Sequence, residues 1–328
     1  MVIYSLRKSS ALQWISAVML VLALAAPAWA AGGKTFSSIV VFGDSLSDTG
    51  NAFALRGLQS TPPYATLDAL LIPDAPYAKG GHHFSNGATW IEQFARPRGL
   101  AGSVRPAFEA SSSKAANYAV GGARAYEDGK NANLSVQVSA YLADVGGQAP
   151  SDALYVIEIG GNDVRDALAA AASGGNPIAI INEAVEQIGN SIGALHAAGA
   201  RKFLVWNTPN LKWTPAIRIL DSIPPGGAGA AVESLGYGFN YWLDNVLVSL
   251  SVLPGIEIKR LDAFKKVNEL VADPEAYGLD VVDAACVTPN IPPFDCKTPD
   301  DYLFWDGIHP TMVVHGIFAQ EAASVLSQ

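Results

Sequence analysis

Short apolar runs alternate with longer segments of helical periodicity along most of the chain. Four of these runs are apolar nearly throughout and rich in β-branched residues, a pattern typical of strands buried on both faces of a sheet. The predicted strands are residues 37–43, 153–160, 202–207 and 256–261.

Helices are predicted between and after these strands. From Pro177 to Gly199, apolar residues recur at spacings of three and four, which places them in one stripe along a helix. Further helices are expected over residues 231–250, 263–271 and 310–326. This alternation predicts an α/β fold, in which a central parallel sheet lies between helical layers and ligands bind at the carboxyl ends of the strands.

Two segments interrupt the alternation. Residues 57–113 carry many Pro, Gly and Ser residues, which predicts long loops over the top of the sheet rather than a separate domain. The glycines of residues 224–230 do not follow a strand with the spacing of a phosphate-binding loop. We therefore expect residues 31–328 to form a single domain with one large core.

The first thirty residues have the pattern of a targeting segment. Arg7 and Lys8 precede an apolar run from about Trp14 to Ala26, and residues 28–30 have the small-x-small form of a cleavage site. This pattern predicts a secretory signal peptide over residues 1–30, cleaved near Ala30. The apolar run is shorter than the roughly 17 residues that span a bilayer. An exported protein, periplasmic or secreted, is expected.

Charge and hydropathy limit the partners of the exported chain. Removing residues 1–30 takes away Arg7 and Lys8 and no acidic residue, so the formal net charge changes from −9 to −11. This charge disfavours nucleic acid and anionic membrane surfaces as partners and favours a neutral or apolar substrate. No later segment has 18 uninterrupted apolar residues, so stable membrane insertion is not expected. The oligomeric state stays open.

The two cysteines form an even pair in an exported chain. Cys286 and Cys296 lie in a proline-rich loop, and this spacing and compartment favour a disulfide over a metal site. Free buried thiols are the alternative.

Ser45 is the first candidate catalytic residue. It follows the first predicted strand at the edge where α/β sites form, and Gly43 allows a tight turn that exposes the hydroxyl. By itself the same pattern fits a serine that caps a helix. The G-x-S-x-G motif of the common α/β-hydrolases is missing, since Leu46 and Ser47 follow Ser45.

Asp306 and His309 supply the other parts of a possible nucleophilic site. They lie three residues apart before the last predicted helix, so one turn can bring the carboxylate to one imidazole nitrogen while the other nitrogen faces a serine. A helix cap and a surface histidine would give the same spacing.

Two glycine-containing turns could stabilise an anion. Asn162 follows a predicted strand and two glycines, and its side-chain amide can donate to a developing oxyanion. The backbone N–H of Gly122, in a second turn with two glycines, could be another donor. An asparagine in a turn is also common without any catalytic role.

Taken together, these motifs resemble the GDSL family of serine esterases and lipases, also called SGNH hydrolases. The motifs are Gly43-Asp44-Ser45-Leu46 with its extension through Asn51, "FSNGATWIEQ" at 84–93, Gly121-Gly122, Gly161-Asn162-Asp163 and Asp306-Gly307-Ile308-His309-Pro310. They occur in the order that the family has, and the resemblance covers residues 38–320. It is closest to the longer exported bacterial members.

The resemblance implies a three-layer α/β/α, flavodoxin-like fold and hydrolysis of carboxylic esters without metal or cofactor. It implies Ser45 as nucleophile, His309 as base and Asp306 as its partner, with oxyanion donors from the Ser45 amide, Gly122 and Asn162. The expected substrate is a small-molecule or lipid ester. The family also includes lipid acyltransferases and phospholipases, so transfer of the acyl group to another alcohol stays open.

Two other functions are compatible with parts of the pattern. A metal-dependent hydrolase could use Asp44, Asp163, Asp306 and His309, although the chain lacks the usual ligand spacings and the first two carboxylates are expected to bond loop amides. A catalytically silent binding protein could use a surface of aromatic residues, although aromatic residues at helical spacing are more often part of the core. These are Trp90, Trp213, Tyr237 and Trp242. The histidines His82 and His83 could line the site, but they are expected to be solvated in the long loop.

Overall fold

The computed structural model describes residues 36–65, 67–109 and 114–328. These residues belong to one compact unit. The predicted signal peptide, residues 1–30, lies outside the described residues. Within the described part of the chain, no helix has the length and apolar character needed to cross a membrane.

The centre of the unit is a parallel sheet. Its strands are β1 (Ile39–Gly43), β2 (Leu154–Glu158), β3 (Lys202–Trp206) and β4 (Glu257–Leu261), hydrogen-bonded in that order. All four predicted strands are therefore confirmed, as is the α/β class. Their apolar sequences follow from their position, because β1 and β2 are buried along their whole length.

A further extended segment lies on the free side of β1. The Val41 N–H donates to the Ala116 carbonyl, and the N–H groups of Tyr118 and Val120 donate to the Val41 and Gly43 carbonyls. Residues 116–120 thus run parallel to β1, although only one isolated bridge is assigned there. Because this segment follows β1 in the chain, the spatial order is the one of a flavodoxin-like sheet.

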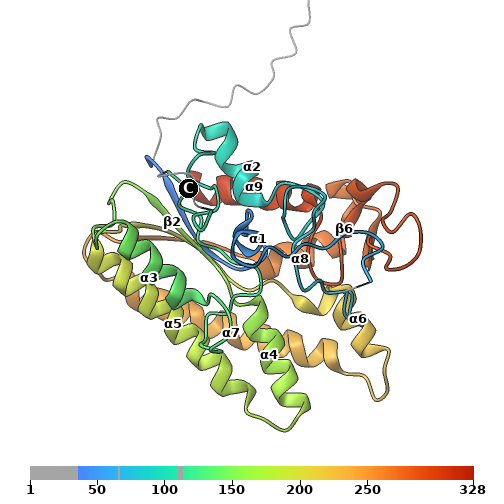
Figure 1. Cartoon of the computed structure of the whole chain (residues 1–328). Helices are drawn as coiled ribbons and strands as arrows, with labels where there is room; N and C mark the ends of the chain where they lie inside the picture. Colours follow the sequence, from blue (N-terminus) through green and yellow to red (C-terminus); the bar gives the residue numbers. More distant parts are fainter. Residues whose placement is uncertain (1–35, 66, 110–113) are drawn as a thin grey trace, which may run out of the picture. The chain divides into compact units, whose positions relative to one another are not determined.

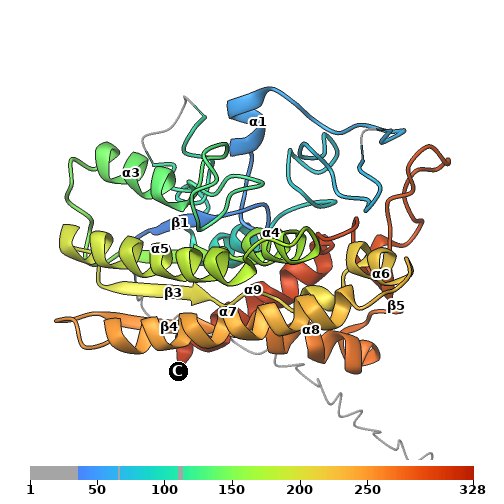
Figure 2. The same cartoon turned by 90° about the horizontal axis from the view of Figure 1, so that it is seen from below.

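Helices cover both faces of the sheet (Figures 1 and 2). Alternate strand residues pack into two separate cores, since successive side chains of a strand point to opposite faces. One core includes side chains of α3 (Leu134–Asp144), α4 (Gly161–Ala172), α5 (Pro177–Ala198) and α7 (Ala228–Leu250). The other includes α2 (Trp90–Ala95), α8 (Ala263–Ala272) and α9 (Met312–Ser327). The expected three-layer α/β/α arrangement is confirmed.

Shorter elements lie at the carboxyl edge of the sheet and around it. They are α1 (Asn51–Arg56), α6 (Pro215–Asp221), the parallel pair β5 (Val281–Ala285) and β6 (Tyr302–Phe304), and single turns of 3₁₀ helix at Arg96–Arg98, Leu211–Trp213, Pro274–Tyr277 and Pro299–Asp301. The predicted disulfide between Cys286 and Cys296 is present in the loop between β5 and β6.

The predicted helices differ from the observed ones mainly at their first residues. The helix expected at residues 231–250 begins at Ala228, and the one expected at 310–326 begins at Met312 because Thr311 is its N-cap. For α5, the start at Pro177 follows from local chemistry: the side chain of Asn176 accepts from the Ala179 N–H, and proline suits the first helical position. α3 and α4 were not predicted.

Candidate active site

Ser45 lies in a turn directly after β1. The carbonyl of Asp44 accepts hydrogen bonds from the N–H groups of Ser47 and Asp48, which closes the turn. The turn starts where β1 and β2 approach closely: a Cβ on Gly43 would lie 2.3 Å from the carbonyl oxygen of Glu158. Real Cβ atoms do not come this near to backbone oxygen, so only glycine fits at this point.

Ser45, His309 and Asp306 form a continuous hydrogen-bonded chain. The Ser45 Oγ lies 2.8 Å from His309 Nε2, and His309 Nδ1 lies 2.7 Å from Asp306 Oδ2. Asp306 is 0% exposed and His309 is 5% exposed. The structure thus brings together three residues that the sequence separates by up to 264 positions, in the arrangement of a nucleophile, a base and a group that orients the base.

Four donors hold the buried Asp306 carboxylate. The backbone N–H groups of Ile308 and His309 donate to Oδ1, at 2.9 and 2.8 Å. The Tyr77 hydroxyl donates to Oδ2 at 2.9 Å, and His309 Nδ1 is the fourth donor, also to Oδ2. These bonds compensate for burial of the carboxylate and fix its orientation toward the imidazole.

Gly122 and Asn162 lie in neighbouring turns at the carboxyl edge of the sheet. The Nδ2 of Asn162 donates to the Ala123 carbonyl at 2.9 Å, which leaves its second hydrogen available, and Arg165 Nη1 donates to Asn162 Oδ1 at 3.0 Å. Gly122 has φ +86°, a value that favours glycine. Among the described residues, the N–H groups of Ser45 and Gly122 have no hydrogen-bond acceptor.

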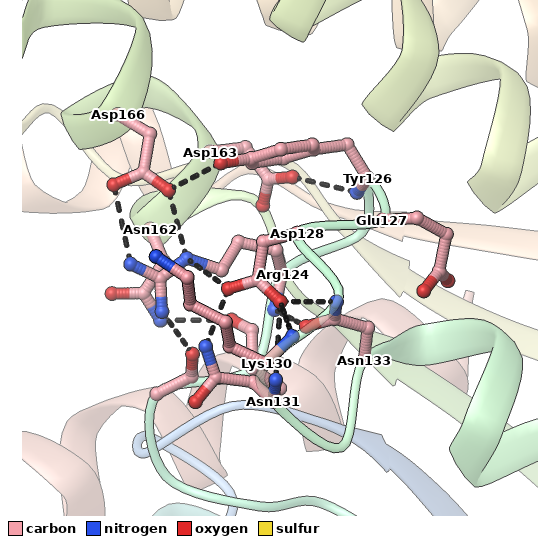
Figure 3. Close-up of polar contacts among 12 residues, drawn as sticks. Arg124, Tyr126, Glu127, Asp128, Lys130, Asn131, Asn133, Asn162, Asp163 and Asp166 are labelled. Carbon is pink, nitrogen blue, oxygen red and sulfur yellow. Dashed lines mark hydrogen bonds and ion pairs between the residues drawn. The ribbon is translucent and has the colours of Figure 1, made fainter.

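A polar cluster fixes the Gly122 turn against the start of α4 (Figure 3). Asp163 Oδ1 accepts from the N–H groups of Ala125 and Tyr126, both at 2.9 Å. One turn further along α4, Asp166 Oδ2 forms an ion pair with Arg124 Nε at 2.8 Å. The loop that carries Gly122 and the helix that carries Asn162 are therefore held together by side chains from α4.

Buried carboxyl groups surround the site. Burial raises the pKa of Asp163 to about 7, although three backbone N–H donors, those of Tyr126, Ala125 and Asp163 itself, oppose the increase. Burial also raises the pKa of Asp44 to about 6. The pKa of Glu158 lies well above its ordinary value because of burial and the nearby Asp44. Its Oε2 accepts from the Ser47 hydroxyl, which in turn accepts from Trp90 Nε1 at 2.9 Å.

The four residues of the metal alternative do not converge. As predicted, Asp44 and Asp163 bond loop amides: Asp44 Oδ1 accepts from the Leu46 N–H, and Asp163 accepts from Ala125 and Tyr126. In residues 36–65, 67–109 and 114–328, no group of three or more His, Cys, Asp or Glu residues is placed to hold a metal ion.

Several polar residues near the site were not predicted or were predicted wrongly. Tyr77 belongs to a Pro-rich loop and Arg165 to a helical segment, and neither residue is part of a recognisable motif. His83 was expected to be solvated, but it is buried and its Nε2 lies 3.0 Å from Glu92. A proline- and glycine-rich loop predicts exposure, whereas here the loop packs onto α2 and α9.

The aromatic residues considered for a binding surface differ in their exposure to solvent. Trp90 is fully buried in the core, whereas Tyr237 and Trp242 are exposed on α7. The four aromatic residues therefore do not form one surface.

The family model for GDSL-like lipases and acylhydrolases matches residues 39–322. The chain therefore belongs to this family, a class of enzymes named for the hydrolysis of ester bonds. A GDSL esterase/lipase of Arabidopsis thaliana is 29% identical over 136 residues, which are 38% of this chain and 39% of the plant protein. Another from the same plant is 35% identical over 126 residues, or 37% and 34% of the two chains.

The chain spans about two fifths of the length of the curated relatives it matches first. Among solved structures, it is similar to an extracellular lipase from Streptomyces rimosus at 14% identity. That comparison covers 88% of this chain and 99% of the lipase, with a TM-score of 0.39.

Proposed function

We propose that this protein is an exported serine esterase that hydrolyses carboxylic esters through an acyl-enzyme on Ser45. The observation that carries the proposal is the hydrogen-bonded chain from Ser45 Oγ through His309 to the buried Asp306. Membership of the GDSL-like lipase and acylhydrolase family supports the reaction class.

In the first half of the reaction, His309 Nε2 takes the proton of Ser45 while Oγ attacks the ester carbonyl carbon. Asp306 accepts from Nδ1–H and stabilises the imidazolium. The tetrahedral intermediate collapses as the bond to the leaving alkoxide breaks, and His309 returns the proton to that oxygen. Water then attacks the acyl-enzyme in the same way, which releases the carboxylic acid and restores Ser45.

The oxyanion is stabilised by the N–H groups of Ser45 and Gly122 and by the Asn162 amide. Their lack of acceptors among the described residues supports this role for the two backbone donors. The bond from Arg165 to Asn162 Oδ1 supports the third, because it fixes which end of the amide is the donor. Loss of one oxyanion donor costs about 2.7 to 4 kcal/mol, so Asn162→Ala should lower kcat about 10² to 10³ fold.

Hydrolysis of a p-nitrophenyl ester tests the assignment. Ser45→Ala should lower kcat about 10⁶ fold, as removal of a catalytic serine does elsewhere. Ser151→Ala, at an exposed serine, is the matched control and should keep full activity. If a folded Ser45→Ala variant keeps more than a hundredth of the normal kcat, the assignment of Ser45 as nucleophile is wrong. If Asn162→Ala keeps the normal kcat, the oxyanion role of Asn162 is wrong.

Export to the periplasm or medium is part of the proposal. Its support is the pattern of residues 1–30, together with the disulfide, which is typical of oxidising compartments. Fractionation of expressing cells followed by N-terminal sequencing should give a product that begins at Ala31. A full-length product that stays in the cytoplasm would contradict this part alone.

A further inference from the structure

A cavity of about 740 Å³ lies between α4, α6 and the start of α7, three helices on the same side of the sheet (Figure 1). The α4 wall includes Arg165, Leu168, Ala169 and Ala172, which are spaced three and four apart or adjacent, together with Asp166 and Ala171. This spacing forms one face of a helix. The opposite wall includes Ile217 of α6 and Ala231 of α7. We call this cavity the α4–α6 groove.

The α4–α6 groove adjoins the candidate active site at two points. Ile308, which lines it, lies between Gly307 and His309, and its N–H donates to Asp306. Arg165, which also lines it, donates to Asn162. The groove is therefore next to both the proposed base and the proposed side-chain oxyanion donor.

The lining is apolar beyond the end nearest the site. The two charged residues of the groove, Arg165 and Asp166, lie at the start of α4, and Asp166 already pairs with Arg124. Farther along, the walls are aliphatic side chains, alanines, prolines and glycines, together with Thr214, whose hydroxyl donates to the Leu211 carbonyl. Such a lining recognises a chain without hydrogen-bonding groups, and its volume is typical of ligand pockets, which have about 300 to 1,000 Å³.

We propose that the α4–α6 groove binds the acyl chain of the substrate, so that the enzyme prefers esters of unbranched medium-length fatty acids. This proposal depends on the proposed esterase function. From Arg165 to Ala172 the helix advances about 10 Å at 1.5 Å per residue. A zigzag alkyl chain with C–C bonds of about 1.5 Å needs about eight carbons for that length. The expected optimum is therefore about C8 to C10.

A series of p-nitrophenyl esters from acetate to palmitate measures the preference. Each methylene that enters the α4–α6 groove should raise kcat/KM up to about fourfold, until the chain reaches the end of the groove. Beyond that length, kcat/KM should level off or fall. A profile that is flat from acetate to decanoate, or highest for acetate, would overturn the proposal.

Variants that fill the groove test its location. Ala169 and Ala231 line the groove and are exposed, so a larger side chain at either position does not disturb the core. Ala169→Trp and Ala231→Trp should each lower the decanoate-to-acetate ratio of kcat/KM at least tenfold. Ala179→Trp, at an exposed position of α5 outside the groove, should keep the normal ratio.

The outcomes separate this proposal from the esterase assignment. If the wild-type protein hydrolyses esters but neither groove variant changes the ratio, the acyl chain binds elsewhere and only the present proposal fails. If the wild-type protein hydrolyses no ester of the series, the proposed function itself fails. If the groove instead bound a second copy of the chain, both groove variants would change the molecular mass of the protein in solution. The decanoate-to-acetate ratio of kcat/KM would then stay unchanged.

Discussion

The buried carboxyl of Asp163 should make the stability of this protein depend on pH. The side chain is fully buried at the first turn of α4, and burial raises its pKa from 3.8 to about 7. Between these two values the folded protein keeps a proton that the unfolded chain has lost. The free energy of unfolding contributed by this group is therefore present in full below pH 3.8 and is lost as the pH rises through 7.

The size of the effect follows from the shift. The pKa changes by about three units, from 3.8 to about 7, and each unit corresponds to about 1.4 kcal/mol. Because the group is completely buried, solvent screening does not reduce this value, which is about 4 kcal/mol. Asp163→Asn keeps a neutral side chain at every pH and should remove this part of the pH dependence.

Chemical unfolding followed by tryptophan fluorescence measures the difference at each pH. The free energy of unfolding of Asp163→Asn minus that of the wild type should rise by about 4 kcal/mol between pH 4 and pH 8. Any constant cost of the amide cancels in this change, as do titrating groups that do not interact with Asp163. Ser151→Ala, at an exposed position and without a titrating side chain, should show a constant difference. A constant difference for Asp163→Asn as well would refute the raised pKa.

Three further results are expected. Arg165→Met should lower kcat about tenfold, which corresponds to the loss of one charge-assisted hydrogen bond. Because Arg165 acts through the Asn162 amide, the same substitution should not lower kcat further in an Asn162→Ala variant. Equal losses of kcat in both backgrounds would show that Arg165 has a different role. Tyr77→Phe should lower the free energy of unfolding by about 1.5 to 3 kcal/mol in urea, because Asp306 loses a buried donor, and an unchanged urea midpoint would contradict this bond. Gly43→Ala should lower the free energy of unfolding by about 3 kcal/mol or more in thermal or urea unfolding, because its Cβ would meet the Glu158 carbonyl. Gly193→Ala, on the open face of α5, should leave the free energy of unfolding unchanged or raise it. Similar effects of the two substitutions would refute the close approach at Gly43.

The sequence predicted β1 and β2 because both strands are buried along their whole length, whereas β4 at the edge of the sheet is partly exposed. A strand such as β2 has no polar face, and its continuous apolar run is distinctive. The opposite applies to α4. This helix begins with Gly161, and the face toward the α4–α6 groove is lined mainly by alanine, so it has no strong apolar stripe. Its length could not be derived from local pattern.

The residues proposed to react could be found from the sequence, whereas the residues that hold them in place could not. Ser45 and His309 stand in motifs that follow strand ends, where α/β folds place ligands. Tyr77 and Arg165 act through single long-range or packed contacts, with Asp306 and Asn162 respectively. Such contacts depend on how loops fold back onto the sheet, and the spacing of apolar residues in the sequence does not indicate how a loop folds. In the α4–α6 groove, α4 meets two helices, α6 and α7, that lie far from it in the chain, so the shape of the groove also required coordinates.

The contact between Ser45 and His309 joins the beginning and the end of the described fold, 264 positions apart. A chain emerging from a ribosome or a translocation pore presents the hydroxyl early and the imidazole last. The pair therefore cannot assemble until the chain has emerged through His309 and the four-stranded sheet has formed. Under the proposed function, a nascent chain would be harmless to the lipids beside it, and ester cleavage would report completed folding more stringently than secondary-structure content does.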